Sequence, residues 1–255
     1  MKLATWNVNS LNVRLPQVLA WSLSTKPDLL ALQETKVIDE KFPREQIEAA
    51  GYEVVYAGQK TYNGVAILSR TPAEDVIFDV PGLDDPDRRI IAATYGDVRF
   101  LNLYVVNGKE VSSDKYEHKL RWLKKVTDYI ESQLSKYPKF IVAGDFNIAP
   151  KDEDVHDPMG WHEKILCSSL EREALERIKA LGLVDTFRLF EQPGNNFSWW
   201  DYRAAAFPRN MGLRIDLILA SKTMSERCQS CEIDKTPRDW ERPSDHAPVV
   251  AQFDV

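Results

Sequence analysis

The chain has 255 residues, of which 44% are hydrophobic and 28% are charged, so it is long enough to bury a sizeable core. Its 33 lysines and arginines against 39 aspartates and glutamates give a net charge of −6, which argues against a protein that passively coats DNA, because duplex DNA repels an acidic protein. The same balance still allows an enzyme whose carboxylates hold a divalent cation behind a local basic rim.

The hydropathy of the chain indicates whether it can cross a membrane, and its cysteines indicate which redox compartment suits it. No apolar run approaches the roughly 18 residues that a membrane span needs, so no membrane partner is expected. Cys167, Cys228 and Cys231 are odd in number, and the last two form a single C-x-x-C with no second pair. Reduced thiols are therefore favoured over a disulfide framework or a zinc site. The sequence predicts a protein of the reducing cytoplasm.

Short β-rich runs recur from one end of the chain to the other. Strands are predicted at residues 2–7, 28–33, 52–57, 63–69, 89–95, 98–105, 139–145, 213–220 and 247–253. Several of these runs are apolar on both faces, which suggests a sheet covered on both sides.

Helical patterns fall between the strands. Apolar spacing predicts one long helix, with a face made of Tyr116, Leu120, Leu123, Ile130 and Leu134. A second helix is predicted to open at Ser168, with Glu171 as its capping-box partner, and to close at Gly182.

No segment has the composition of a linker, so residues 1–255 are predicted to form a single α/β domain. Periodicity does not give the order of the strands. A doubly wound parallel sheet and a two-sheet sandwich flanked by helices both remain open at this point.

Polar side chains stand at or near the ends of six predicted strands, the last pair just before its strand begins. They are Asn7, Asn9, Glu34, Lys36, Tyr104, Asn107, Asp145, Asn147, Asp216, Asp245 and His246. Strand ends are rigid mounts for functional groups, so these side chains are expected to share one rim of the molecule.

Each of these residues also has an ordinary structural explanation. Asn7 and Asn147 are turn formers, Glu34 can cap a helix or pair with Lys36, and Tyr104 can be a core aromatic. These explanations account poorly for a carboxylate, an amide, a phenol and an imidazole that all stand at strand ends.

This set of groups suits phosphodiester hydrolysis. The reaction needs an oriented and activated water, neutralisation of charge on the phosphoryl oxygens, and help for the leaving oxygen. Carboxylates that hold Mg²⁺, with Mn²⁺ as a substitute, are the expected cation site. The chain contains no G-x-S-x-G, H-E-x-x-H or G-x-x-x-x-G-K-[ST] motif that would support another mechanism.

Six blocks together resemble exonuclease III and its abasic-site endonuclease relatives, in order and spacing over essentially the whole chain. They are LATWNVNSL at 3–11, LQETK at 32–36, YNGVAI at 62–67, GDFN at 144–147, GLRID at 212–216 and SDHAP at 244–248. Other members of the wider superfamily share the glutamate and the final Ser-Asp-His, whereas the first and fifth blocks point to the DNA-repair branch. The resemblance implies a four-layer α/β sandwich, with two packed mixed sheets flanked by helices.

The resemblance also implies roles for individual residues. Glu34 resembles the principal metal ligand, with Asn7 and Asp245 near the metal. Asp145 resembles the base that deprotonates the attacking water, with Asn147 orienting that water. 

Three further roles concern the phosphate. His246 resembles the imidazole that binds it, supported by Asp216. Tyr104 resembles a phenol that bonds the scissile phosphate or assists the leaving group, and Asn107 a phosphate-contacting amide.

DNA contacts are implied at a second set of positions. The substrate-facing residues carried over from the family are Lys36, Tyr62 and Asn63 for the backbone, and Trp199, Leu213 and Ile215 for the wall of a pocket that takes a flipped-out abasic sugar. The stretch 161–167 departs from the longer loop of some relatives, and its Leu166 leaves open whether internal abasic sites or 3′ ends are preferred.

The expected function is Mg²⁺-dependent hydrolysis of double-stranded DNA at abasic sites, nicks and 3′-blocked ends, with 3′→5′ exonuclease activity, by a chain that can act as a monomer. The alternatives are a superfamily phosphatase acting on an inositol lipid or another phosphorylated small molecule, and a catalytically inactive DNA-binding protein.

Overall fold

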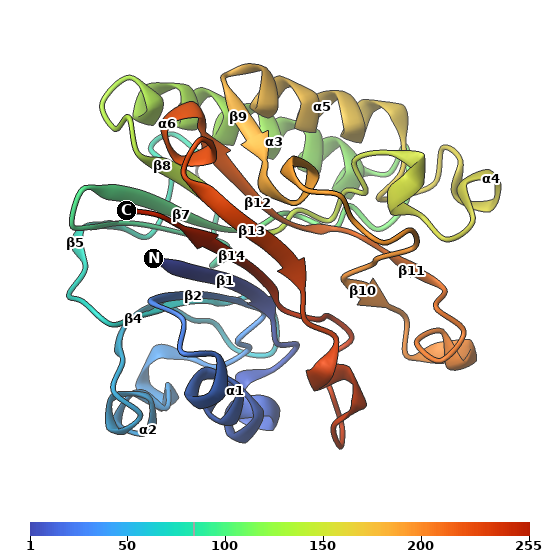
Figure 1. The fold of residues 1–255 in the computed structure, drawn as a ribbon. Helices are drawn as coiled ribbons and strands as arrows, with labels where there is room; N and C mark the ends of the chain where they lie inside the picture. Colours follow the sequence, from blue (N-terminus) through green and yellow to red (C-terminus); the bar gives the residue numbers. More distant parts are fainter. Residues whose placement is uncertain (84) are drawn as a thin grey trace.

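The computed structural model describes residues 1–83 and 85–255. Two six-stranded mixed sheets pack face to face, and helices cover both outer faces (Figure 1). This arrangement confirms the predicted four-layer sandwich and excludes the doubly wound single sheet.

The first sheet has the strand order β13-β14-β1-β2-β4-β3. Its strands are β1 (Lys2–Asn7), β2 (Leu29–Gln33), β3 (Glu53–Ala57), β4 (Val65–Ser69), β13 (Cys228–Ile233) and β14 (Val249–Phe253). The two chain ends lie side by side in this sheet, where β1 runs antiparallel to β14 (Figure 1).

The second sheet has the strand order β5-β6-β7-β8-β12-β9. Its strands are β5 (Glu74–Ile77), β6 (Ile90–Tyr95), β7 (Val98–Tyr104), β8 (Phe140–Asp145), β9 (Leu183–Asp185) and β12 (Asp216–Ser221). A separate two-stranded ribbon is formed by β10 (Trp199–Trp200) and β11 (Gly212–Leu213).

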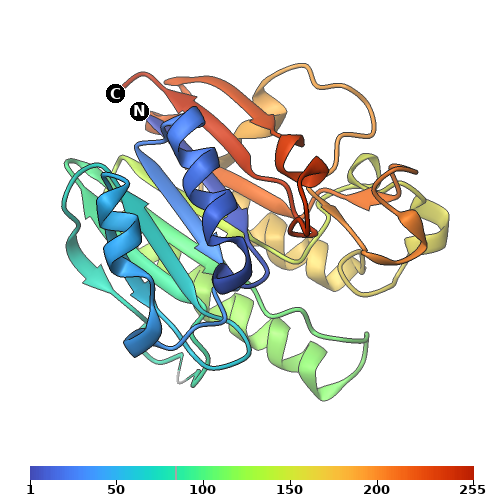
Figure 2. The same cartoon turned by 90° about the horizontal axis from the view of Figure 1, so that it is seen from below.

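The α-helices are α1 (Leu11–Thr25), α2 (Arg44–Ala49), α3 (Asp114–Leu134), α4 (Pro158–Trp161), α5 (Ser169–Ala180) and α6 (Lys222–Ser225). Short 3₁₀ turns lie at Asp39–Lys41, Asp152–Asp154, Thr186–Leu189, Arg203–Ala205 and Thr236–Asp239. Helices α1 and α2 cover the first sheet, as the view from below shows (Figure 2), and α3 and α5 cover the second.

Strands that are apolar on both faces contribute to two cores at once. In β8, Ile141 packs between the sheets while Val142 packs under α3 and α5. In β2, Ala31 faces the other sheet while Leu32 packs under α1 and α2. Burying a Leu, Ile or Val side chain contributes roughly 1.5–3 kcal/mol, which explains why both faces of these strands are apolar.

The two predicted helices are confirmed as α3 and α5, and α5 carries the expected capping box of Ser168 and Glu171. The apolar face of α3 is rotated from the predicted one, because Leu120 and Leu134 are only half-buried while Lys119 and Trp122 are fully buried.

The prediction of one strand over 213–220 is wrong. Leu213 pairs with Trp199 in the ribbon, whereas the strand from Asp216 pairs with β8. Between them, Arg214 turns inward to form buried ion pairs with Asp154 and Asp185.

The predicted strands omitted β5, β9, β10 and β13, and helices α1 and α2 were not predicted. Strand β13 has largely polar residues and lies at a sheet edge, so it lacks an apolar run. Pro16 lies inside α1, where proline normally argues against a helix.

Within the described residues, no helix combines the length and the apolar character that a membrane crossing requires.

Candidate active site

The strand register brings the predicted residues to one edge of the sandwich. In the first sheet, β1 and β2 are parallel, so Asn7 and Gln33 are partners and Glu34 follows directly. In the second sheet, Asp145 lies opposite both Tyr104 on β7 and Asp216 on β12. The two sheets thus place these side chains on facing strand ends.

Three of these side chains form a tight cluster. Glu34, Asp145 and His246 each offer one potential ligand atom, and the three atoms lie within 4.8 Å of one another. Asp145 and His246 are almost completely buried, whereas the Glu34 side chain is 18% exposed. The cluster therefore opens to solvent on the glutamate side.

The backbone at these strand ends adopts conformations that non-glycine residues rarely take. Glu34, Lys36 and Asn147 have φ values of 53°, 53° and 49°. Such residues cost about 1–3 kcal/mol each and occur at sites where position matters more than stability. Gly144 has φ 149°, and a Cβ there would lie 1.9 Å from the carbonyl oxygen of Leu103, so only glycine fits before Asp145.

Asn7 joins the two carboxylates. Its Nδ2 donates to Glu34 Oε1 at 2.9 Å and to Asp145 Oδ2 at 2.9 Å, while its Oδ1 accepts from the backbone N–H of Asn9. Asn7 thus holds the carboxylates at a fixed separation from a buried strand.

Asn147 orients Asp145 locally. Its backbone N–H donates to Asp145 Oδ1 at 2.9 Å, and its side-chain amide donates to the carbonyl oxygen of Val105 at 3.0 Å. The amide of the exposed Asn107 donates to Asn147 Oδ1 at 3.0 Å. The loops after β7 and β8 are therefore linked through these two asparagines.

His246 lies between two aspartates. Its Nδ1 is 2.9 Å from Asp216 Oδ2, and its Nε2 is 3.8 Å from Asp145 Oδ2. Asp216 is held in turn by Ser198, whose hydroxyl donates to the same Oδ2 at 2.6 Å. The Nδ1 contact directs Nε2 toward the cluster.

The two buried groups have strongly altered pKa values. Burial raises the pKa of Asp145 to about 7; the imidazolium of His246 opposes this shift and Asp216 adds to it. Burial alone would lower the pKa of His246, but the carboxylates of Asp216 and Asp145 outweigh it and raise that pKa to about 10. At neutral pH the imidazole is therefore a cation that donates from both nitrogens.

Tyr104 is a phenol that stays protonated. Its pKa is raised well above the usual value by burial and then by the negative charges of Glu34 and Asp145. The guanidinium of Arg89 lies over its ring at 4.8 Å from the centroid. Tyr104 can therefore donate a hydrogen bond at any physiological pH.

Asp245 lies beside this cluster rather than in it. Its two oxygens accept from Asn9 Nδ2 at 2.9 Å and from Trp199 Nε1 at 3.0 Å. Asn9 also accepts from the ammonium of Lys36 at 2.5 Å. Lys36 is at the same time 2.8 Å from Glu34 Oε2, so an entering cation would have to share or displace this ammonium.

The predicted DNA-facing residues divide by exposure. Tyr62 is 67% exposed, whereas Asn63 is buried, and its backbone carbonyl accepts from the N–H of Lys36. Trp199 is half-buried, while Leu213 and Ile215 are fully buried in an apolar cluster with Leu166. Of the three pocket-wall residues, Trp199 is the one that presents surface.

Sequence reasoning missed Ser198 and Lys119, and it gave Asn9 no role. Asn9 belongs to the same Trp-Asn-Val-Asn block as Asn7, so its motif was a usable signal. Ser198 and Lys119 lie in segments without a recognisable motif, and only the fold brings them to the site.

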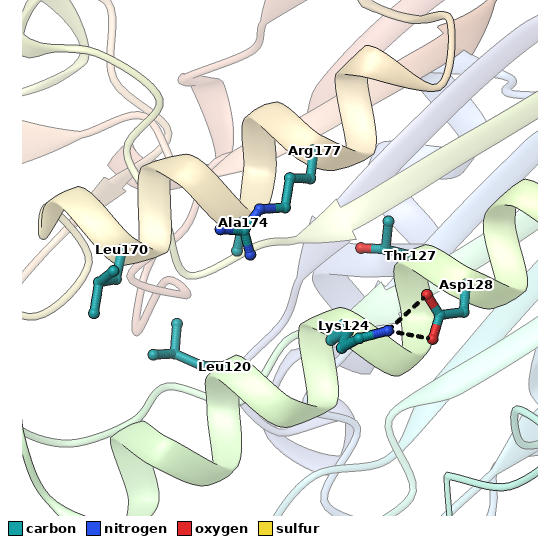
Figure 3. A pocket seen from close by; sticks show the side chains of 7 residues that line it. All are labelled: Leu120, Lys124, Thr127, Asp128, Leu170, Ala174 and Arg177. Carbon is teal, nitrogen blue, oxygen red and sulfur yellow. Dashed lines mark hydrogen bonds and ion pairs between the residues drawn. The ribbon is translucent and has the colours of Figure 1, made fainter.

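A cavity of about 220 Å³ lies between α3 and α5 (Figure 3). It is lined by Leu120, Lys124, Thr127, Asp128, Leu170, Ala174 and Arg177. None of these is a predicted site residue, so this cavity does not compete with the strand-end cluster as the candidate active site.

The pKa values predict a bell-shaped dependence of kcat on pH. Asp145 can accept a proton only when it is ionised, so kcat should rise with pH as Asp145 ionises. Because a nearby cation favours the ionised form and lowers the pKa, this acid limb should lie at or below pH 7. His246 loses its charge near pH 10, so kcat should fall there. Initial rates between pH 5 and 10.5 test this; a steady fall in kcat from pH 5 to 8 would contradict the assignment of Asp145 as a base.

Comparisons with known proteins agree over nearly the whole chain. A family model described as "Endonuclease/Exonuclease/phosphatase family" matches residues 4–246. The chain is 36% identical over 266 aligned residues to exodeoxyribonuclease III of Haemophilus influenzae. The alignment covers 99% of this chain and 100% of the relative.

Several solved structures cover 100% of this chain and are covered by it in full, among them the following two. One is the 3′ phosphatase NExo from Neisseria bound to a product DNA hairpin, with 48% identity and a TM-score of 0.98. The other is an AP endonuclease from Archaeoglobus fulgidus, with 39% identity and a TM-score of 0.96.

Proposed function

Because the chain belongs to the endonuclease/exonuclease/phosphatase family, as its sequence predicted, we propose that it is a DNA-repair phosphodiesterase of the exonuclease III type. Its substrates are duplexes with an abasic site, a nick or a blocked 3′ end, and it removes nucleotides from 3′ ends. The observation that carries this function is the convergence of Glu34, Asp145 and His246 within 4.8 Å. The relatives named for exodeoxyribonuclease, 3′ phosphatase and AP endonuclease activities support the DNA substrate.

The side chains at the cluster fit Mg²⁺. Glu34 and Asp145 supply carboxylate oxygens, which this cation prefers, while the solvent-facing side leaves room for the waters it retains. His246 is a poor ligand because it carries a proton at neutral pH. We assign Glu34 as the principal ligand, with Asn7 and Asp245 supporting the site; Mn²⁺ can substitute. When bound, the cation neutralises charge on the phosphoryl oxygens.

The protein side chains perform the remaining steps. Ionised Asp145 takes the proton of the attacking water, and Asn147, which bonds both the Asp145 carboxylate and the loop at Val105, keeps that carboxylate oriented. The imidazolium of His246 donates from Nε2 to a phosphoryl oxygen, and Asp216 holds it in that orientation. Tyr104 donates its phenolic hydrogen to the phosphate or the leaving oxygen, and Asn107 donates to the phosphate.

Action as a monomer remains a prediction. The single domain over 1–255 and the cytoplasmic location remain predictions. The cysteines Cys167, Cys228 and Cys231 are free, as a reducing compartment would allow.

Removal of the cation should abolish hydrolysis. EDTA is expected to silence the enzyme and Mg²⁺ to restore it, and Glu34→Ala should raise the Mg²⁺ concentration for half-maximal rate on the order of 10- to 100-fold or more, because an oxygen ligand is lost. Rates over a Mg²⁺ titration measure this, with the exposed Glu40→Ala as control. An unchanged titration curve for Glu34→Ala would remove Glu34 from the metal site.

Three matched duplexes test the function itself. They carry an internal abasic analogue, a 3′-phosphate, or a plain recessed 3′-hydroxyl, and the product of each is followed on a gel. An inositol phosphate is tested separately as a fourth substrate. Mg²⁺-dependent cleavage of at least one duplex is expected. Hydrolysis of the inositol phosphate with no cleavage of any duplex would instead identify a small-molecule phosphatase.

A further inference from the structure

A lysine lies beneath the active site with no exposed surface. Lys119 is on the inward face of α3 and its side chain is 0% exposed. An ammonium in such a place is costly unless all of its hydrogens are bonded. Here all three are used: the Nζ donates to the carbonyl oxygens of Asn147 at 2.7 Å and Asn107 at 3.2 Å, and to the carboxylate of Glu171.

One carbonyl belongs to Asn147, whose N–H bonds the Asp145 carboxylate, and the other to Asn107, the neighbour of Asn147 across the two loops. Asn107 follows β7 and Asn147 follows β8, and these strands are parallel neighbours. The side chains of the two asparagines are bonded to each other as well, at 3.0 Å. Lys119 therefore links the backbones of the two loops that the side-chain amides of Asn107 and Asn147 also link.

The carboxylate partner fixes the ammonium in place. Glu171 is fully buried and also accepts from the N–H of Leu166 at 3.1 Å and from the Ser168 hydroxyl at 2.6 Å. The capping-box glutamate of α5 is thus also the counter-ion of a lysine on α3. Gly108 packs against the lysine stem, since a Cβ there would lie 3.1 Å from Lys119 Cδ.

We infer that Lys119 is a positioning residue for hydrolysis: its ammonium holds the backbone of Asn107 and Asn147 in one fixed relation, and through Asn147 it fixes the Asp145 carboxylate. The inference rests on the proposed function. This role differs from that of a buried ion pair that only stabilises the core, because two of the three hydrogen bonds of the ammonium go to the two active-site loops. A misplacement of catalytic groups by about 1 Å from a distant change can cost about 100-fold in rate.

The test separates positioning from stability. Lys119→Met removes the ammonium, and Lys119→Met combined with Glu171→Gln removes both charges, so that no unpaired carboxylate is left buried. Lys124→Met is the matched control, because Lys124 is on the same helix but is exposed, where it pairs with Asp128 (Figure 3). Thermal melting of each variant is recorded, and kcat and KM are measured below the lowest melting temperature.

The expected result is a fall in kcat of about 10- to 100-fold for both Met variants, with KM for the duplex within about threefold of the parent. Lys124→Met should match the parent. Lys119→Arg, which keeps the charge and the donors, should recover most of the lost kcat.

Two outcomes would overturn the inference. The folded Met variants could cut DNA at the parental rate, or both Met variants could fail to melt cooperatively, which would make Lys119 a requirement of the fold alone. A parent protein and Lys124→Met that cut no duplex at all would instead refute the proposed function.

Discussion

Asp145→Asn should lower kcat for DNA hydrolysis by about 10²- to 10⁴-fold, the range for loss of a general base. The asparagine keeps the shape of the side chain, and its single carbonyl oxygen can accept from Asn7 or from the N–H of Asn147 but not from both. It cannot take a proton from water. Single-turnover rates on a duplex with a 3′-phosphate or an abasic analogue give the size of the loss.

The same substitution should not weaken the fold. Burial raises the pKa of Asp145 to about 7, above its unfolded value, so the folded state loses stability as pH rises from that unfolded value to about 7, and the full cost is present at pH 8. An uncharged asparagine removes this cost, and Tm at pH 8 should be equal or higher. Asp152→Asn, at an exposed carboxylate paired with Arg172, is the control and should leave kcat unchanged. Full activity of Asp145→Asn would show that another group acts as the base.

His246→Asn is expected to lower kcat by about 10²- to 10³-fold, because a charged donor aimed at the phosphate is lost. It should also lower stability, unlike Asp145→Asn. The imidazolium is the buried counter-charge for Asp145 and Asp216, and removing one partner of a buried pair costs about 3–5 kcal/mol. Activity must therefore be measured well below the Tm of the variant.

Asp216→Asn separates the charge of His246 from the orientation of its ring. The amide oxygen can still accept from Nδ1, so the ring stays oriented, but the pKa of His246 should fall because the largest charge that raises it is gone. The alkaline limb of the pH profile should then move to lower pH while Nε2 still reaches the phosphate. An alkaline limb that stays in place for Asp216→Asn would show that His246 is not the group that titrates there.

The parts of the site that the sequence predicted all lie in short blocks at strand ends. Asn7, Glu34, Asp145 and His246 could be assigned to one rim because each stands at or beside the end of a strand that is largely apolar. Periodicity could not give their spatial order, since it does not record which strands pair. The family resemblance supplied the two-sheet architecture.

The parts that were missed are polar residues in places where polar residues are rare. Lys119 occupies a core position of α3, and a lysine in a helix pattern is ordinarily read as solvent-facing. Arg214 was placed inside a strand, although its guanidinium turns to two buried aspartates and separates two strands. In each case the ion-pair partner lies at least 29 residues away in the chain, at Asp185 for Arg214 and at Glu171 for Lys119, so no local pattern indicates it.

The proposed function requires that Glu34 and His246 hold a cation and a phosphate in one site. Anomalous diffraction is the sharpest test of this requirement, on a crystal of the Asp145→Asn protein soaked with Mn²⁺ and a short duplex that ends in a 3′-phosphate. A Mn²⁺ peak bonded to a carboxylate oxygen of Glu34 is expected, with the phosphate about 2.7–3.2 Å from His246 Nε2. A Mn²⁺ peak away from Glu34, or a phosphate bound out of reach of His246, would contradict this requirement.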